Sequence, residues 1–355
     1  MNTIAKAIRY LSEPEAIRKV LNESLRTQDL EAENIAVGAQ TVKYQRIRFG
    51  NSKLGDFDRE KGYTRNDITL EWVEKTLTQD KGDSLVLDKI DDEEAMANGI
   101  VRIANRYMDK VQNPALDTYR LSLIAKAECT AVINATLNSD NILANILLGK
   151  ARMEEMKVDT TSLLLYITPA AKALLKEAAL KKGYWTHGNW NGNLDAEVEM
   201  FDGCKVIPVP SAYFGNSDVQ AILLHKDAAP AMIKYKEAEY FDKIPGFGRR
   251  KAQVDLGIYH DMFVYDELTR AICLFIKTSA STKTITYAKG DVTTSKSVPT
   301  QGATAAGGSF TVAANPFDDV TDKTFVGWWD GHNLYQAGDT YYVPNNAVTF
   351  TALWH

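Results

Sequence analysis

The spacing of apolar residues predicts one long helix in the first third of the chain. Over 91–112, apolar side chains recur at intervals of three and four, which gives a single apolar stripe. They are Met96, Ile100, Ile103, Tyr107 and Val111. The acidic run DDEE opens this helix, where carboxylates complement the helix dipole, and Pro114 is expected to end it. Such a helix is roughly 30 Å long.

Alternation of residue types over 41–88 predicts a two-armed extended segment. In TVKYQRIRF, one side of the strand carries Val42, Tyr44, Arg46 and Arg48, and the other side also mixes apolar and polar residues. The run ITLEWVEKTLTQDKGDSLVLD is expected to form the second arm, with a polar loop between the two arms. Because a hairpin with two mixed faces is not stable alone in water, it lies either on the rest of the molecule or on another molecule. The pattern leaves both alternatives open.

The region 128–280 alternates predicted helices and strands. NILANILLGKARMEEM is expected to be helical. TSLLLYITPAAKALLKEAALKKG is expected to form a buried strand and then a helix that begins at Thr168 and Pro169 and ends at Gly183. In FDGCKVIPVP, the pair Asp202-Gly203 predicts the tight turn of a hairpin. These elements favour a mixed α+β domain.

Further strands are predicted between this hairpin and residue 280. We expect a strand in VQAILLH, a short helix in DAAPAMIKY and a strand in KYKEAEYF. Two apolar strands follow in GIYHDMFVYDELTRAICLFIK, on either side of a turn at Asp266 and Glu267.

The two ends of the chain differ from its middle. Residues 1–35 read as an amphipathic helical arm, although a plain surface helix fits the pattern equally well. Residues 284–355 contain no Glu, Arg or Cys, but they hold half of the tryptophans of the chain. Short apolar runs separated by Gly, Pro and Asn predict a separate small all-β domain there, after a linker in KTSASTK.

Composition narrows the class of protein. The chain is 45% hydrophobic and 25% charged, as in ordinary globular proteins, and 355 residues allow two or three domains. A net charge of −5 argues against a general nucleic-acid binder. Cys129, Cys204 and Cys273 are scattered and are expected to be reduced thiols. No signal peptide and no long apolar run that would span a membrane are visible in the sequence.

Candidate chemistry is sparse. The sequence contains no phosphate-binding, dinucleotide-binding, nucleophile-elbow or zinc-protease motif. PGFGRR is better explained as a turn than as an anion cradle, and Cys204 lacks a placed histidine that would make it a nucleophile. The five histidines are dispersed, and we expect His225 and His260 to be satisfied structural residues. We therefore predict no catalytic, cofactor-binding or metal-binding site, and no enzyme.

The order of these elements resembles the major capsid proteins of tailed bacteriophages, which have the Hong Kong 97-like fold. The segments that carry the resemblance are the charged loop at 41–88, DSLVLDKIDDEEA leading into the long helix, LLYITPAAKALL, FDGCKVIPVPSAYF and DMFVYDELTRAICLFIK. The resemblance covers about residues 1–280. It implies an α+β capsid fold with an N-terminal arm at 1–35, an E-loop at 36–90, a peripheral domain with spine helix at 91–127, an axial domain at 128–240 and a return to the peripheral domain at 241–280.

The resemblance also implies how the chain would act. In that family the E-loop lies over a neighbouring subunit, so charged residues of this loop are candidates for pairing between subunits. They are Arg46, Arg48, Lys53, Asp58, Arg59, Lys61 and Arg65. Some members crosslink an E-loop lysine to a neighbour, but nothing here identifies such a pair. The expected partners are further copies of the chain in hexamers and pentamers, a separate scaffolding protein, a protease, a portal and packaged double-stranded DNA that is bound non-specifically.

The C-terminal segment resembles a different family. KTFVGWWDGHNLYQAGDTYYVPNNAVTFTALW is similar to the Listeria–Bacteroides repeat, also called the internalin B-repeat. This resemblance implies a β-grasp-like surface module at 281–355. Aromatic residues there form either its core or a face that stacks on a glycan or another cell-surface polymer. They are Trp328, Trp329, Tyr335, Tyr341 and Trp354.

The sequence thus predicts a structural protein of the virion, assembled in the host cytoplasm, with an outward-facing C-terminal decoration domain. Two alternatives stay open. One is the shell of an encapsulin-like nanocompartment with the same fold. The other is a surface-adhesion protein built on the C-terminal repeat, against which the single repeat copy and the lack of a visible signal peptide argue.

Overall fold

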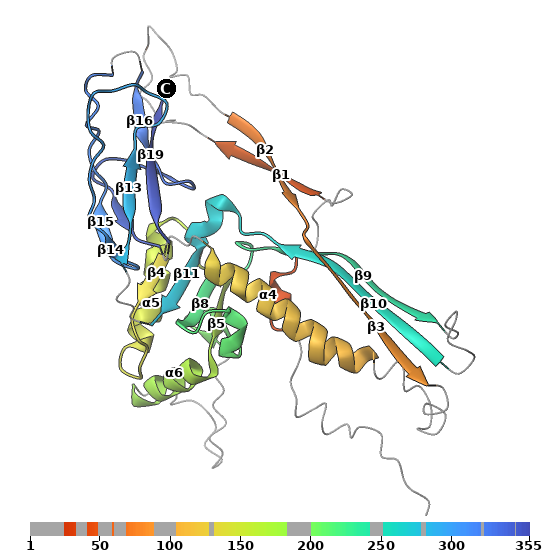
Figure 1. Ribbon diagram of the computed structural model, residues 1–355. Coiled ribbons are helices and arrows are strands. Elements are labelled where there is room, and N and C mark those ends of the chain that lie inside the picture. Colours follow the sequence, from red (N-terminus) through yellow and green to blue (C-terminus); the bar gives the residue numbers. More distant parts are fainter. Residues whose placement is uncertain are drawn as a thin grey trace, which may run out of the picture. The chain divides into compact units, whose positions relative to one another are not determined.

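The computed structural model describes residues 25–32, 41–48, 59, 69–88, 104–127, 131–182, 200–241, 251–277, 282–320, 323–344 and 346–355 (Figure 1). The chain divides into two compact units. The first is built from Met1–Glu31, Leu77–Arg120 and Ala231–Asp261, and the second from Ala32–Thr76, Leu121–Pro230 and Met262–His355.

The first unit contains a three-stranded sheet beside a long helix. The strand order is β3 (Gln79–Asp88), β10 (Lys251–Met262), β9 (Ala231–Phe241), and β3 and β10 are antiparallel. The helix is described from 104 and runs through a π-helical segment, η2 (Met108–Gln112), into α4 (Asn113–Lys126). Tyr107 of the predicted apolar stripe packs against a small core of Ala104, Val254 and Leu256, whereas Val111 is 46% exposed. The other stripe residues, at 96, 100 and 103, lie outside the described residues.

The helix does not end at Pro114, contrary to the expectation from sequence. Pro114 is the second residue of α4, and the helix continues to Lys126. The five-residue π segment directly before it supplies the physical reason. A wider turn can accommodate the proline ring, and the missing backbone N–H of proline costs little at the start of a segment. The helix therefore continues beyond its predicted end, through α4 to Lys126.

Buried hydrogen bonds and an ion pair hold residues 25–32 against α4. Asp117 accepts hydrogen bonds from the backbone N–H of Arg26 (2.9 Å), the backbone N–H of Thr27 (3.0 Å) and the Thr27 hydroxyl (2.8 Å). Arg120 donates to Thr27 Oγ1 (2.9 Å) and pairs with Glu31 (3.1 Å). Burial raises the pKa of Asp117, although these hydrogen bonds oppose the shift. Arg120 is fully buried, so its hydrogen bonds to these partners have to compensate for the cost of taking its charge out of water.

The second unit contains a six-stranded mixed sheet. Its order is β4 (Ala131–Asn134), β11 (Ile272–Ile276), β8 (Val219–His225), β5 (Leu163–Ile167), β7 (Cys204–Pro208) and β6 (Met200–Phe201). The helices α5 (Ile142–Glu155) and α6 (Pro169–Lys181) share one apolar core with it. All five residues of β5 and of β11 are buried, which explains why their sequences are uniformly apolar.

Local signals in this unit are confirmed. Thr168 caps α6, and its hydroxyl accepts a hydrogen bond from Ala171 N with Pro169 at the first helical position. Asp202 and Gly203 both have positive φ, +48° and +79°, as a two-residue hairpin turn of this kind requires. The strand in VQAILLH and the helix in NILANILLGKARMEEM are also present, as β8 and α5.

Two expectations from the sequence are wrong. DAAPAMIKY contains no helix, because Pro230 interrupts it and β9 begins at Ala231. Only Thr69–Thr76, strand β2, pairs with β1 (Thr41–Arg48), whereas the rest of the predicted second arm is β3 and pairs with β10. The predicted turn at Asp266 and Glu267 is present as a 3-10 helix, η4 (Asp266–Ala271), with a predicted strand on either side. It is followed by β11, which lies inside the six-stranded sheet rather than with β10.

Residues 282–355 consist of short strands around an aromatic core. A four-stranded sheet has the order β13 (Ile285–Ala288), β19 (Val348–Trp354), β16 (Phe325–Trp329), β17 (Leu334–Tyr335). Two smaller pairs are β12 (Thr282–Lys283) with β14 (Thr304–Ala305), and β15 (Ser309–Thr311) with β18 (Thr340–Tyr342).

The core of this C-terminal β-domain is built largely from stacked rings. Tyr287 packs edge-on against Trp328 with centroids 4.7 Å apart and stacks on Phe350 at 5.2 Å. Gly290 has φ +66°, and a Cβ there would collide with the carbonyl oxygen of Ala352, so only glycine fits.

Candidate assembly surfaces

One face of the β1–β2 hairpin is held within its own unit. Register pairs Tyr44 with Val73 and Arg46 with Glu71, so these side chains share a face. Tyr44 packs edge-on against Tyr265, with ring centroids 4.8 Å apart. Arg46 donates to Glu71 (2.7 Å) and to Asp266 (3.2 Å), and its hydrogen bond to the Glu71 carboxylate raises the pKa of Arg46. Burial, and secondly the charge of Asp266, raise the pKa of Tyr44 to about 12.

The opposite face of the hairpin is open. Gln45 pairs with Trp72 and Lys43 with Glu74 on this side, and Lys43 and Glu74 form an ion pair. Trp72 is 64% exposed and Leu70 is 60% exposed, which is unusual for side chains of this size. The structure thus bears out the first alternative for one face of the hairpin, whereas contact of the other face with another molecule stays a prediction. One face rests on the same unit, and the other presents apolar groups with no cover among the described residues.

The structure places few of the predicted E-loop contacts. Arg46 is engaged within the chain, as described above. Arg48 lies in β1 opposite Thr69, and Arg59 is exposed in a turn. Four further candidates lie outside the described residues, namely Lys53, Asp58, Lys61 and Arg65. Pairing of any of these residues between subunits stays a prediction. Sequence reasoning missed Trp72 and Leu70, although the alternation placed them on the face of Gln45.

The predicted aromatic residues of the C-terminal β-domain divide by burial. Trp328 is fully buried, and its indole N–H donates to the Ala313 carbonyl (2.9 Å). Tyr341 is also buried, and it packs edge-on against Tyr335 at 5.0 Å. Trp329, Tyr335 and Trp354 are partly exposed. Trp354 nonetheless donates its indole N–H to the Lys289 carbonyl (2.9 Å). Of the partly exposed rings, Trp329 lies next to the buried Trp328 in β16, where side chains alternate between faces.

The described thiols are placed for packing rather than for chemistry. Cys204 and Cys273 are free and fully buried. Burial raises the pKa of Cys204, and it raises the pKa of Cys273 to about 12. A thiol with a raised pKa is a poor nucleophile at neutral pH. Within the described ranges, no group of three or more His, Cys, Asp or Glu side chains is placed to hold a metal ion.

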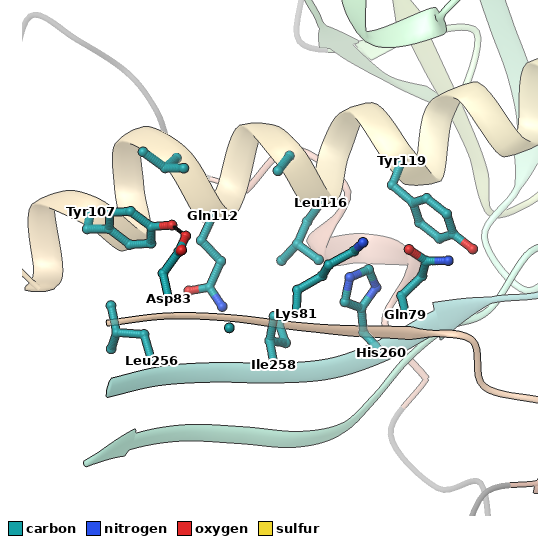
Figure 2. Close-up of a pocket in the computed structure, with 13 residues that line it drawn as sticks. Gln79, Lys81, Asp83, Tyr107, Gln112, Leu116, Tyr119, Leu256, Ile258 and His260 are labelled. Atoms are coloured by element: carbon teal, nitrogen blue, oxygen red, sulfur yellow. Dashed lines mark hydrogen bonds between the residues drawn. The ribbon is translucent and has the colours of Figure 1, made fainter. Parts of the chain in front are cut away.

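A cavity of about 310 Å³ lies in the first unit, between the long helix and strands β3 and β10 (Figure 2). Figure 2 shows Gln112 and Leu116 directed from the helix toward Ile258 and His260 of β10. His260 is only 4% exposed, and its Nδ1 has no hydrogen-bond partner among the described residues. His260 is thus structural, as expected, but it is not fully satisfied.

His260 should make the first unit less stable in acid. Burial, and secondly Arg120, lower its pKa from 6.5 to about 4; Lys81 acts in the same direction, and Asp261 opposes it. Because the unfolded chain takes up the proton first, the stability contributed by neutral His260 is present above pH 6.5 and is lost as the pH falls toward 4. The loss is on the order of 3 kcal/mol at most.

Urea unfolding between pH 7 and pH 4 measures this effect. His260→Gln should flatten the acid loss of stability, whereas His225→Gln, at a partly exposed histidine in β8, should leave it unchanged. If the free energy of unfolding depended on pH in the same way in His260→Gln and in the unaltered protein, the acid sensitivity would come from other groups.

No helix in the described part of the chain combines the length and apolar character needed to cross a bilayer. No protein-family model matches the sequence, and no curated protein is significantly similar to it.

Solved structures of phage proteins do resemble the chain, at low sequence identity. The capsid structure of Cyanophage P-SCSP1u matches with a TM-score of 0.60 and 9% identity, over 78% of this chain and 92% of that one. The mature capsid of bacteriophage PhiM1 matches with a TM-score of 0.52 and 12% identity, over 79% and 91%. A structure from Mycobacterium phage Adephagia matches with a TM-score of 0.51 and 11% identity, over 79% and 100%. The chain therefore has the mixed α+β fold of phage capsid proteins, as the sequence predicted.

Proposed function

We propose that the chain is the major capsid protein of a tailed bacteriophage, a structural and non-enzymatic protein that assembles with copies of itself into an icosahedral shell. The observation that carries this proposal is the shared fold. The match extends over nearly the whole length of two phage capsid chains and over more than three quarters of this chain. Because the match covers most of each chain, the similarity is not limited to one substructure that many unrelated folds share.

The open face of the β1–β2 hairpin supports the same function. A shell protein needs a surface that a neighbouring copy covers, and Trp72 and Leu70 offer large apolar groups on a strand pair. Tryptophan is among the residues that contribute most to protein interfaces. We assign this face to contact with a second copy of the chain. Exposed ion pairs on the hairpin, such as Lys43 with Glu74, would add little to its free energy.

The domain assignments belong to this proposal. We assign an N-terminal arm to 1–35, an E-loop to 36–90, the spine-helix region to 91–127, the axial domain to 128–240 and the peripheral return to 241–280. Strands from different assigned segments pair with one another. The pairings group β3 and β9 with β10, and β11 with the sheet of β4 and β8. Residues 281–355 form the C-terminal module, for which the internalin-type repeat and the binding of a glycan stay proposals.

The remaining partners follow from the role of a shell. The inner surface would face double-stranded DNA through non-specific contacts that weaken with salt, and a net charge of −5 requires these contacts to be few or local. Scaffolding protein, protease and portal would act during assembly in the host cytoplasm. An encapsulin-like compartment has no specific observation in its favour here, and neither does a surface-adhesion protein.

Electron microscopy of the expressed full-length protein tests the proposal. We expect closed shells or capsomer rings, alone or after co-expression with a scaffolding protein. Trp72→Glu should leave the subunit folded, as judged by circular dichroism, but should prevent or strongly reduce assembly. Assembly would bury the new carboxylate at the interface without a partner of opposite charge, which is strongly unfavourable.

Leu353→Glu is the matched control, because Leu353 is also an exposed apolar residue but lies in the C-terminal β-domain. It should leave assembly unchanged. Monomers that persist in the unaltered protein with a scaffolding protein present would argue for the adhesion alternative. Normal shells from Trp72→Glu would exclude the hairpin face as the interface without excluding the shell.

A further inference from the structure

The C-terminal β-domain contacts the six-stranded sheet at a surface centred on one arginine. Arg152 of α5 donates from Nη1 to the carbonyl of Val132 in β4 (2.7 Å) and from Nη2 to the carbonyl of Gly307 (3.5 Å). Its guanidinium carbon lies 4.4 Å from the centroid of the Tyr342 ring. One side chain thus connects a helix, a strand of the sheet and two segments of the C-terminal β-domain.

A second contact lies at a different part of the C-terminal β-domain. Arg270 of η4 donates from Nη2 to the side-chain oxygen of Asn333 at 2.6 Å. Its Nε donates to the backbone carbonyl of Glu267 (3.0 Å), which orients the guanidinium before it reaches Asn333. One contact lies at β18 and the other directly before β17. Two separate contacts restrain the rotation of the C-terminal β-domain against the six-stranded sheet as well as its separation from that sheet.

The backbones of the two parts also approach closely. Gly307 has φ +75°, and a Cβ there would lie 2.5 Å from the Val132 carbonyl oxygen and 3.0 Å from Asn134 N. Glycine is required both by this conformation and by this proximity. So close an approach of two backbones is typical of a packed interface and not of two domains joined only by a flexible linker.

The strand that receives the C-terminal β-domain is an edge strand. β4 is the first strand in the order of the six-stranded sheet and pairs only with β11 among the described strands. An uncovered edge presents free backbone groups to which another chain can pair, and proteins protect such edges by covering them. Arg152 satisfies the Val132 carbonyl, and Gly307 lies against the same edge.

We propose that the C-terminal β-domain is a fixed cap on the open edge of β4, held in one orientation by Arg152, and not a freely tethered decoration. The occupant of this edge is the segment of the same chain around Gly307 and Tyr342. The cap would prevent pairing between the β4 edges of two copies. The proposal concerns a single chain and does not depend on assembly into a shell.

Double electron–electron resonance on the full-length monomer tests the proposal. Spin labels at Ala173→Cys in α6 and Thr311→Cys in β15 report the distance between the two parts, since both positions are exposed. Cys204 and Cys273 are buried with raised pKa values and should not be labelled, and Cys129 is replaced by serine. We expect one narrow distance distribution in the otherwise unaltered protein. Arg152→Gln should broaden it roughly twofold or more, because the linked domains then move independently.

Lys150→Gln is the matched control. Lys150 lies on the same helix, and its replacement removes an ion pair with Asp202, but Lys150 is not part of the contact with the C-terminal β-domain. Its distribution should stay narrow. Arg270→Gln, which removes the Asn333 contact and the local bond to the Glu267 carbonyl but leaves the Arg152 contacts in place, serves if Arg152→Gln fails to fold, and it should broaden the distribution partially. A broad distribution in the unaltered protein, or an unchanged one in both arginine variants, would overturn the proposal.

Hydrogen–deuterium exchange of the peptide that contains 131–134 gives a second readout. Arg152→Gln should increase its exchange rate relative to Lys150→Gln, because the edge of β4 is then opened to water. Equal rates in the two variants would contradict the role of the C-terminal β-domain as a cap.

Discussion

Trp328→Ala is expected to unfold the C-terminal β-domain while leaving the six-stranded sheet folded. The Trp328 side chain is fully buried and lies within ring-packing distance of Tyr287 (4.7 Å), Phe325 (5.4 Å) and Phe317 (6.1 Å). Removing a buried tryptophan costs about 3–5 kcal/mol. The Ala313 carbonyl would also lose its hydrogen-bond donor. A domain of this size has a total stability of only about 4–11 kcal/mol.

Differential scanning calorimetry with near-ultraviolet circular dichroism measures this effect. The transition of the C-terminal β-domain should fall to much lower temperature or disappear, whereas the transition of the six-stranded sheet remains. Trp329→Ala is the matched control, because it removes the same side chain from the neighbouring, less buried position. A loss of similar size in both variants would show that the core does not depend on Trp328 in particular.

Arg120→Met is expected to destabilise the first unit by about 3–5 kcal/mol. Arg120 is fully buried, and Asp117 is only 1% exposed. Without the guanidinium, the Asp117 carboxylate keeps its backbone donors from Arg26 and Thr27 but loses its neighbouring positive charge. Thr27 and Glu31 lose a hydrogen-bonding partner as well. Residues 25–32 should detach from α4.

A double-mutant cycle in urea distinguishes charge from packing. Asp117→Asn with Arg120→Met should recover part of the lost stability, because the pair is then neutral while an acceptor remains for Thr27. Lys126→Met, at an exposed position on the same helix, should change the urea midpoint by a few tenths of a molar at most. If the double variant lost as much as the sum of the two single ones, the charges would not be coupled.

The elements that sequence reasoning predicted well depend on neighbouring residues. The cap at Thr168 and the turn at Asp202 and Gly203 are encoded within a few positions, and both are present as expected. The uniformly apolar runs of β5 and β11 also reveal their burial directly. Local propensity and the global fold agree at these places.

The features that the sequence did not reveal depend on residues far apart in the chain. Asp117 and Thr27 are 90 positions apart, and Arg152 and Gly307 are 155 positions apart. No pattern of either segment alone indicates such a pair. The π segment before Pro114 was missed for a related reason, since a proline in a helix usually signals its end. The division of 69–88 between two sheets likewise depends on a partner strand, β10, that lies more than 160 residues later.

The place of β19 in its sheet constrains how the C-terminal β-domain is made. β19 lies between β13 and β16, yet it is the last strand of the domain to be synthesised. Its parallel neighbour β13 precedes it by more than 60 residues, so their pairing closes a long loop. The domain therefore cannot form its central sheet while it is still being translated. Until 348–354 have left the ribosome, the aromatic residues that will pack on β19 stay exposed, which leaves the domain open to aggregation up to that point.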